Sequence, residues 1–337
     1  MLDGFFDVEN RLEVLSKQGD PLEVLNRVVP WELFRETLEG VRVKERKNKA
    51  GRKPYDVVLM FKILVLQSMY NLSDDAVEYQ ICDRLSFMRF LDLSLGARVP
   101  DAKTVWLFRE QLGKAGLVQS LFTQFDTHLR EHGFAAQKGQ IVDASIVQSP
   151  RQRNTREENK QVKKGETPEA WRVQKARQKD VDARWTKKNG TNHYGYKNHI
   201  QVDTKHKLIR DCHVTSASVH DSQVFDTLLD EDNSSRDVWA DSAYQSRATI
   251  ERLEANGYRP HLQRKGKRGK PLTPREKKGN TTRSRTRSRV EHIFGAQRAR
   301  AGNLLLRSIG LARARTNIYL RNLSYNMNRL GTLTPTA

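Results

Sequence analysis

The stretch that decides the fold is Gln140-Ile141-Val142-Asp143-Ala144-Ser145-Ile146-Val147. It is a short run dominated by branched apolar residues, which is typical of a strand buried inside a sheet. One carboxylate, Asp143, interrupts the run, and an unpaired charge in such surroundings costs free energy. The stretch therefore predicts a buried strand whose single acid has a counter-ion or a chemical role.

Downstream of this strand, the pattern alternates between strands and helices. We expect strands at 194–203, 207–215, 238–240 and 258–262, and helices at 224–229, 248–255 and 312–330. The strands at 194–203 and 207–215 should form a hairpin, and the last helix should pack on the sheet. This order predicts an α/β domain over residues 136–330, with a mixed five-stranded sheet flanked by helices.

Two segments of this domain break the pattern. Residues 148–192 are polar and charged, which indicates an insertion that is either disordered or a small helical flap. Residues 264–289 hold twelve Lys or Arg residues and one acid, Glu276. So many like charges cannot be buried in a protein core, so we expect a basic loop that is solvated or ordered by a polyanion.

Upstream of the strand, residues 1–135 predict an all-helical domain. Ser73 and Asp101 each precede an apolar helical pattern and should be N-caps. The basic link 44–53 joins the first helices to the rest. The paired helices between residues 73 and 111 fit a helix-turn-helix that reads DNA and a dimerisation or packing core equally well.

The net charge of the chain indicates which kind of partner it binds. Its 337 residues include 60 Lys and Arg against 40 Asp and Glu, a net charge of +20. A surface so basic attracts a polyanion, usually nucleic acid. The acidic N-terminal residues, the short apolar run 57–70, and two cysteines without metal-ligand spacing predict a cytoplasmic, nucleoid-associated protein without a membrane partner.

Three carboxylates combine with this charge to suggest a catalytic site. Asp143 and Asp241 each belong to a short strand-like run, and Glu291 lies in a helical pattern. On that helix Arg287, four residues before the acid, and Arg298, seven after, share its face. A few carboxylates on rigid elements can hold two divalent ions that cut a phosphodiester. For each acid alone, a helix or turn cap or a helix salt bridge is the better explanation, and only the three together favour a catalytic site.

These residues carry a family resemblance. The blocks 141–145, 239–244 and 287–295 resemble, in order, the three signature blocks of DDE transposases. Within that group they are most similar to the bacterial insertion sequence five family, of the insertion sequence four-like group. Residues 194–197 and 214–222 resemble the family's second and third strands, and residues 51–109 its helical N-terminal domain. The resemblance spans about residues 50 to 330.

The resemblance implies a ribonuclease H-like domain in which Asp143, Asp241 and Glu291 are catalytic and bind two Mg²⁺ ions, with Mn²⁺ as a substitute. It implies an enzyme that cleaves double-stranded DNA at the inverted-repeat ends of a mobile element. The freed 3′-hydroxyl is then joined to target DNA, with the protein acting as a homodimer. A nuclease that does not join, or a repressor with idle acids, is the alternative.

Four basic residues are candidates for contacts with DNA. Arg287, Arg289 and Arg298 lie on the helix of Glu291 and should position phosphates. The wider group's helix motif has a Tyr seven residues before the Glu, where this chain has Ser284, so no role of that ring carries over.

Two further positions have open interpretations. Lys197, the fourth basic candidate, fits a phosphate contact or a lysine that protects an edge strand from aggregation. The pair His220-Asp221 fits either the metal site or a turn in which the aspartate caps the next helix.

Overall fold

The computed structural model describes residues 6–41, 53–188, 190–266, 269–301 and 305–334. The chain divides into two compact units, residues 1–124 with 323–337, and residues 125–322. Two helices have residues in both units: α8 (Leu117–Glu131) and α13 (Leu311–Leu333). The basic link 44–53 lies outside the described residues except for Lys53.

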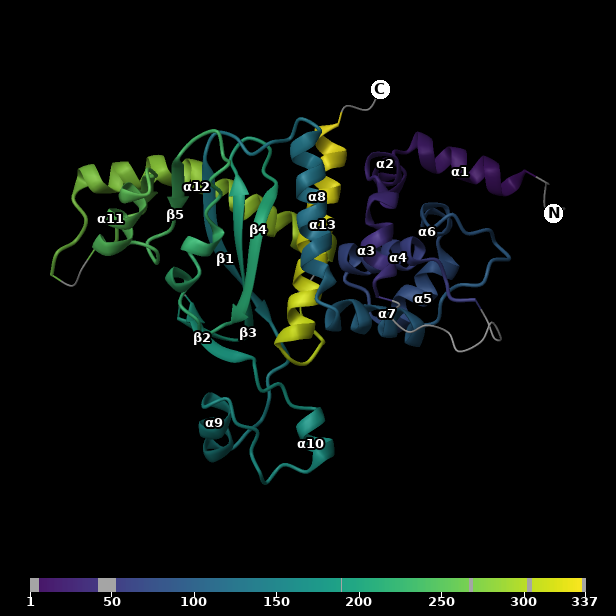
Figure 1. Cartoon of the computed structure of the whole chain (residues 1–337), viewed down its shortest axis with the longest axis horizontal. Coiled ribbons are helices and arrows are strands. Elements are labelled where there is room, and N and C mark those ends of the chain that lie inside the picture. The colour runs from purple at the N-terminus through teal and green to yellow at the C-terminus, as the bar shows by residue number, and fades with distance from the viewer. Residues whose placement is uncertain (1–5, 42–52, 189, 267–268, 302–304, 335–337) are drawn as a thin grey trace. The chain divides into compact units, whose positions relative to one another are not determined.

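The first unit is helical (Figure 1). Its elements are α1 (Asp7–Lys17), α2 (Pro21–Val28), η1 (Trp31–Phe34), α3 (Arg35–Glu39), α4 (Val57–Tyr70), α5 (Asp74–Asp83), α6 (Leu85–Phe90) and α7 (Ala102–Lys114). The predicted N-caps are confirmed, because Ser73 accepts from the amide of Ala76 and Asp101 from that of Thr104. Helix α4 is buried on nearly every side and forms the centre of this unit.

Among the described helices, only one bent pair has the length and hydropathy that a membrane span needs. Among the described residues, no single helix is both long and apolar enough to cross a bilayer. Helices α4 and α5 reach the threshold only when they are taken together, and the chain bends by 102° between them.

The second unit is built on a mixed sheet. Its strands are β1 (Gln140–Gln148), β2 (Arg184–Lys188), β3 (Thr191–Asp203), β4 (Ile209–Ser216), β5 (Asp237–Ala240) and β6 (Arg259–Leu262). The main order is β4-β3-β1-β5-β6, and β2 pairs with the first residues of β3. Strand β3 pairs antiparallel with β4 on one side and with β1 on the other, whereas β1, β5 and β6 run parallel. Three antiparallel strands followed by two parallel ones confirm the ribonuclease H-like prediction, with six strands instead of five.

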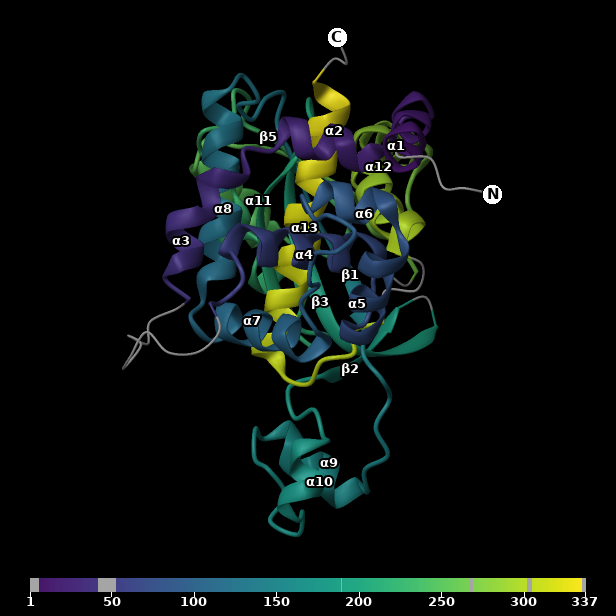
Figure 2. The same cartoon turned by 90° about the vertical axis from the view of Figure 1, so that its right-hand side faces the viewer.

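Helices cover both faces of this sheet (Figure 2). On the face of Val142, an apolar cluster joins β5 and β6 to the 3₁₀ turn η3 (Asp226–Leu228) and to α11 (Arg247–Ala255). Successive side chains of a strand point to opposite faces, so Asp143 faces the other side. There it meets α12 (Pro274–Ala301). The predicted helix at 224–229 is wrong, because η2 (Asp221–Gln223) and η3 stand in that region.

Helix α13 packs on the sheet as predicted, over its residues in the second unit. The hydroxyl of Tyr319 donates to the carbonyl of Cys212 on β4, at 2.5 Å. Asn322 exchanges amide hydrogen bonds with Asn198 on β3, at 2.9 and 3.1 Å. These contacts fix the helix across the antiparallel half of the sheet.

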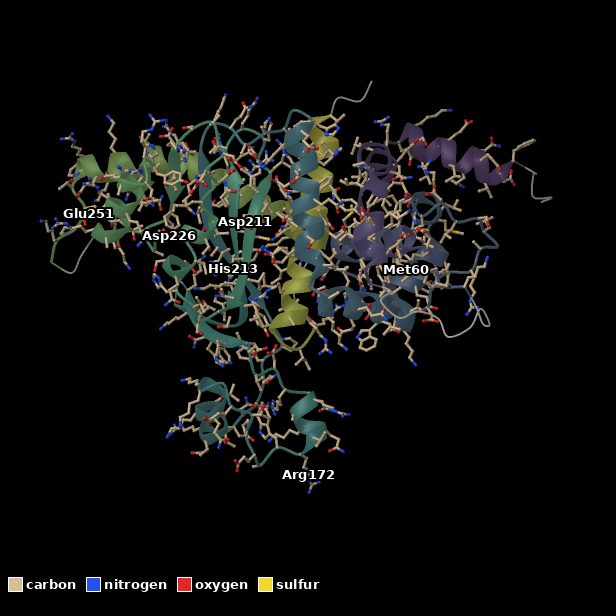
Figure 3. The ribbon with its side chains drawn as sticks, in the orientation of Figure 1. Met60, Arg172, Asp211, His213, Asp226 and Glu251 are labelled. Atoms are coloured by element: carbon tan, nitrogen blue, oxygen red, sulfur yellow. The ribbon has the colours of Figure 1, made fainter. Side chains whose placement is uncertain are left out.

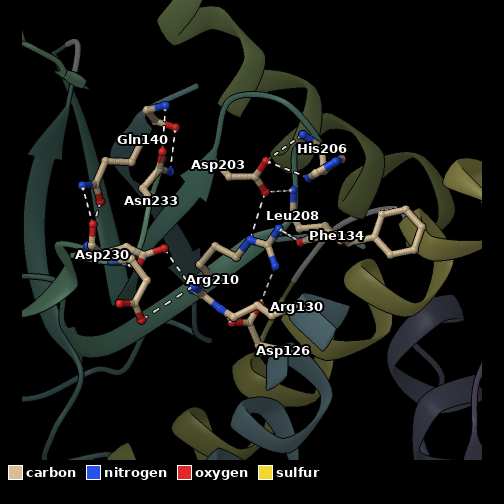
Figure 4. A network of polar contacts seen from close by, with 12 residues as sticks. Asp126, Arg130, Phe134, Gln140, Asp203, His206, Leu208, Arg210, Asp230 and Asn233 are labelled. Atoms are coloured by element: carbon tan, nitrogen blue, oxygen red, sulfur yellow. Dashed lines mark hydrogen bonds and ion pairs between the residues drawn. The ribbon is translucent and has the colours of Figure 1, made fainter. Parts of the chain in front are cut away.

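A buried ion-pair network secures the hairpin between β3 and β4 (Figure 4). The guanidinium of Arg210 donates to Asp203 at 3.0 Å and to Asp126 on α8 at 2.8 Å. Arg130 binds Asp126 in turn, at 2.7 Å, and also Asp230, at 2.9 Å. Removing one member would leave a buried charge without its partner, so the network holds the edge of the sheet.

The insertion after β1 is ordered. It contains α9 (Arg156–Lys163), α10 (Val173–Arg177) and strand β2, so the helical-flap interpretation holds and the strand was missed. Thr155 and Glu158 form a capping box at the start of α9. Glu158 also accepts hydrogen bonds from Trp171 and Lys175, both at 2.6 Å. Ion pairing at Glu158 therefore adds to the few buried apolar residues of this segment, Val162, Trp171 and Ala183.

Candidate active site

Asp143 lies on β1, and Asp241 directly follows β5, the parallel strand that pairs with β1. Strand β1 pairs with β5 through Gln140 with Val238 and Ile141 with Trp239, an offset of 98 residues (238 − 140). Asp241 follows Asp143 by the same 98 residues (241 − 143), so the same register places them side by side where β5 ends. Burial is the largest cause of the raised pKa of Asp143, and the charge of Asp241 acts in the same direction.

Asp143 is a buried carboxylate held by two donors. It is 8% exposed, and its Oδ1 accepts from the amide of Ala144 at 2.8 Å. Its Oδ2 accepts from Nη1 of Arg287 at 2.7 Å. Burial raises the pKa of Asp143 to about 6, although the Arg287 guanidinium acts in the opposite direction. Part of the population is therefore protonated near pH 6.

Glu291 reaches the same guanidinium from helix α12. Its Oε1 accepts from Nη2 of Arg287 at 2.8 Å, and its side chain is 61% exposed. The spacing of four residues places Arg287 and Glu291 on one face of the helix, as the sequence predicted. Arg287 thus bridges an acid on the central strand and an acid on α12.

The arrangement suits a cation. Within the described part of the chain, no three His, Cys, Asp or Glu side chains converge as a metal site would require. The positive charge between Asp143 and Glu291 is instead the guanidinium of Arg287. Carboxylate oxygens are the ligands that Mg²⁺ prefers. In this structure Asp143 and Glu291 therefore hold a guanidinium, although their oxygens are of the type that binds Mg²⁺.

Helix α12 begins earlier than the sequence interpretation allowed. Residues 264–289 were expected to be a loop, but the helix starts at Pro274 and continues through Glu291. Thr273 and Glu276 hold each other's backbone amides as a capping box, at 2.9 and 3.3 Å. The signal Thr273-Pro274-Arg275-Glu276 was present in the sequence, and the surrounding positive charge concealed it.

Ser284, seven residues before Glu291, anchors the same helix. Its hydroxyl accepts from Nε2 of Gln263, just after β6, at 2.6 Å. Asn280 fixes the neighbouring turn through two hydrogen bonds to the backbone of Arg264. This part of α12 is therefore tied to the end of β6, which sets the depth at which Arg287 enters the site.

The other predicted DNA contacts differ in whether their side chains already bind another group of the protein. Arg298 is exposed. Arg289 donates to the backbone carbonyl of Thr204 at 2.9 Å. The ammonium of Lys197 binds Asp221 at 2.8 Å and the carbonyl of Val219 at 2.7 Å, and its side chain is 12% exposed. The edge-strand interpretation of Lys197 is wrong, because β3 is paired on both sides.

The pair His220-Asp221 forms a turn in a way that differs from the prediction. The N-cap of η2 is His220, whose side chain accepts from the amide of Ser222, so the prediction that Asp221 is the cap is wrong. Asp221 instead receives the ammonium of Lys197 and lies 3.9 Å from Nδ1 of His199.

Tyr244 belongs to the Asp241 block, where the sequence pattern gave it no role. The ring is 1% exposed, and its hydroxyl has no hydrogen-bond partner in the described residues. Burial raises the pKa of Tyr244 well above its usual value, and the charges of Asp221, Asp143 and Asp241 act in the same direction. Tyr244 is therefore a neutral phenol that lies close to the carboxylates.

Two family models match this chain. The model of the family described as "Transposase DDE domain" matches residues 135–327, which contain all three acids. A second model, "Transposase domain (DUF772)", matches residues 10–111.

A solved structure was also found: the cryo-EM structure of the piggyBac transposase synaptic complex with hairpin DNA. It is 13% identical, with a TM-score of 0.48 over 93% of this chain and 75% of that one. The fold assignment rests on the strand order and register described above. Since the first family model covers more than half of the chain, this protein belongs to the transposase DDE domain family.

Proposed function

We propose that this protein is a transposase of the insertion sequence five branch that cleaves the ends of an insertion sequence and joins the 3′-hydroxyl to target DNA. Family membership implies an enzyme that cleaves or moves DNA and depends on a divalent metal. The observation that carries the proposal is the shared 98-residue offset of Asp143 and Asp241, with Glu291 joined to Asp143 through Arg287.

In the proposed reaction, Asp143, Asp241 and Glu291 hold two Mg²⁺ ions, or Mn²⁺ in their place. Such ions supply Lewis acidity to the attacking and leaving oxygens of an in-line displacement. First, a water oxygen bonds to phosphorus at the element's end and the 3′-oxygen leaves. That 3′-hydroxyl then attacks a phosphorus of target DNA. The bond from this phosphorus to the target strand's own 3′-oxygen breaks, and that oxygen leaves as a hydroxyl, so the strands are joined without a covalent intermediate on the protein.

Two arginines are the proposed phosphate contacts. When a metal cation takes over the charge between Asp143 and Glu291, the guanidinium of Arg287 is released, and its planar fork suits a phosphate. Arg298 is exposed on the same helix and available to a strand that lies along it. Arg289 and Lys197 have structural partners, and we assign them the positioning of α12 and of Asp221.

The protein would act on DNA as an assembly of more than one chain. Joining two ends requires two sites, so we expect a homodimer on double-stranded DNA that holds both inverted-repeat ends and the target. The helical residues 1–135 would bind DNA or form the dimer, and residues 136–330 would hold the catalytic site. A nucleoid-associated, cytoplasmic location follows from this substrate.

The test is a strand-cleavage and joining assay. Labelled duplexes carrying the inverted-repeat ends should give nicked and joined products with Mg²⁺. Nicks without joined products would indicate a nuclease, and binding without nicks a repressor. Asp241→Asn and Glu291→Gln should each abolish both products.

The matched control for these variants is Glu251→Gln. Glu251 is an exposed acid on α11, labelled in Figure 3, and it pairs with the exposed Arg247 on the same helix. This variant should cleave and join as the wild type does. If Asp241→Asn or Glu291→Gln kept wild-type cleavage, the role assigned to these acids would be wrong.

A further inference from the structure

In addition to the site around Asp143, a polar pocket lies on the same face of the sheet. It has a volume of about 350 Å³ and is lined by strands β1 and β3 and helices α12 and α13, all within the second unit. Its polar lining includes Ser145, Asn198, Gln297, Arg298 and Arg321, and none of its described lining residues is Asp or Glu. A pocket of this size holds on the order of ten water molecules and lies in the range of small-ligand sites.

Arg321 is the unusual residue of this pocket. It is 9% exposed, and its Nε and Nη1 atoms are buried without a hydrogen-bond partner in the described residues. Burial alone lowers the pKa of Arg321 to about 10, with no carboxylate contributing among the residues that the structure describes. A buried guanidinium without a counter-ion is costly, and most buried polar groups are paired.

The amides beside Arg321 do not compensate its charge. Asn198 and Asn322 bind each other, and Gln297 donates to Asn322 at 3.0 Å. These bonds hold the pocket wall rigid. Arg298, exposed on α12, adds a second positive charge to the lining. Two arginines without an acid form a site for an anion, and planar guanidinium groups suit phosphate oxygens best.

We propose that this pocket binds a phosphate group of a nucleic-acid strand, with Arg321 as the buried donor and Arg298 as the exposed one. Ser145 and Gln148 follow Asp143 on β1 by two and five residues, or roughly 7 and 17 Å at 3.3 Å per residue. One nucleic-acid strand could therefore reach both this pocket and Asp143. That it is the strand cut at Asp143 rests on the proposed function, whereas phosphate binding in the pocket does not.

The first experiment is thermal unfolding in phosphate and in chloride at equal ionic strength, without divalent metal. Inorganic phosphate should stabilise the wild type. Arg321→Gln should unfold in chloride at the wild-type temperature or above, because it removes an uncompensated buried charge, and it should lose the stabilisation by phosphate. Arg315→Gln removes an exposed charge from the same helix and should keep that stabilisation.

The second experiment measures binding of a single-stranded oligonucleotide with a 5′-phosphate and of the same oligonucleotide with a 5′-hydroxyl. Arg321→Gln should weaken binding roughly tenfold to a hundredfold, the value of a hydrogen bond to a charged group. An effect on the phosphorylated strand alone identifies a terminal phosphate. An equal effect on both strands identifies an internal phosphodiester.

Two outcomes would overturn the proposal. In one, Arg321→Gln keeps the phosphate stabilisation and both affinities of the wild type. In the other, it unfolds well below the wild type in chloride while phosphate has no effect on the wild type, which would make Arg321 structural. Neither result bears on metal-dependent cleavage, so the function proposed above would stand or fall separately.

Discussion

At the scale of single residues, the buried negative charge of Asp143 lowers the stability of the folded protein. Asp143 is ionised only at a cost, because burial raises its pKa from 3.8 to about 6. The folded protein therefore binds more protons than the unfolded chain between about pH 4 and 6, so this residue's contribution to stability falls as pH rises through that window. A difference of about 2 pH units corresponds to about 3 kcal/mol.

The first prediction concerns Asp143→Asn. The amide removes the cost of the buried charge, so this variant should be more stable than the wild type at about pH 8, by about 1–3 kcal/mol, and should lose that advantage at about pH 4. Chemical denaturation of both proteins at the two pH values measures the difference. Equal effects of the substitution at both pH values would contradict a raised pKa at Asp143.

The second prediction concerns Arg287, whose charge opposes the effect of burial on the pKa of Asp143. Arg287→Gln should raise that pKa further, and metal ligands must be deprotonated. The pH at half-maximal metal-dependent cleavage should therefore move upward, and Arg287→Lys should restore part of the shift. A lower rate with an unchanged pH midpoint would show that Arg287 acts on the substrate alone.

At the scale of elements, close packing of the strands decides which residues are tolerated. Gly195 lies where β3 leaves β2 and meets the end of β1. Its φ is +147°, and a Cβ there would lie 2.3 Å from the carbonyl oxygen of Val147. Only glycine therefore allows β3 to pair with β1 and β2 at the same point.

The third prediction follows from this contact. Gly195→Ala should destabilise the fold by about 2 kcal/mol or more, since it combines a strained φ with a backbone clash. Gly295→Ala is the matched control, because a Cβ added to this helical glycine would meet no neighbouring group within 4 Å among the described residues, and alanine favours helices. Denaturant titration should show opposite signs for the two substitutions. A neutral Gly195→Ala would mean that the strands separate there.

At the scale of the whole molecule, the charge of +20 governs encounter with DNA. Binding should weaken steeply as salt rises, because each neutralised phosphate releases counter-ions. The helix of Glu291 carries part of this charge, since seven of the twelve Lys or Arg residues of 264–289 lie from Pro274 onward. Because the helix starts at Pro274, these seven charges lie on a rigid element instead of a loop.

The fourth prediction compares the contributions of two arginines of that helix, Arg298 and Arg289, to the salt dependence of DNA binding. Arg298→Gln should reduce the slope of log affinity against log salt by about 1, the value for one phosphate contact on duplex DNA. Arg289→Gln should leave the slope nearly unchanged, because its guanidinium donates to the carbonyl of Thr204. Titrations at several salt concentrations measure both slopes. Equal changes for the two variants would contradict the structural role of Arg289.

The sequence by itself determined five of the six strands of the sheet, the caps at Ser73 and Asp101, and the three candidate acids. These features depend on neighbouring residues, through hydrophobic periodicity and local hydrogen bonds. The start of α12 was missed, because a capping box and the ion pair between Arg264 and Glu276 stabilise it in place of an apolar pattern. Strand β2 was missed because its polar residues form a strand only by pairing with β3.

Only the tertiary structure decided how distant residues meet. It paired the strand of Asp143 with the strand that Asp241 follows, set Arg287 between Asp143 and Glu291, and paired Lys197 with Asp221. It also enclosed Arg321 in a pocket whose described lining holds no acid. Such pairings join segments tens to more than a hundred residues apart. Packing of whole strands and helices fixes them, and no local pattern in the chain encodes that packing.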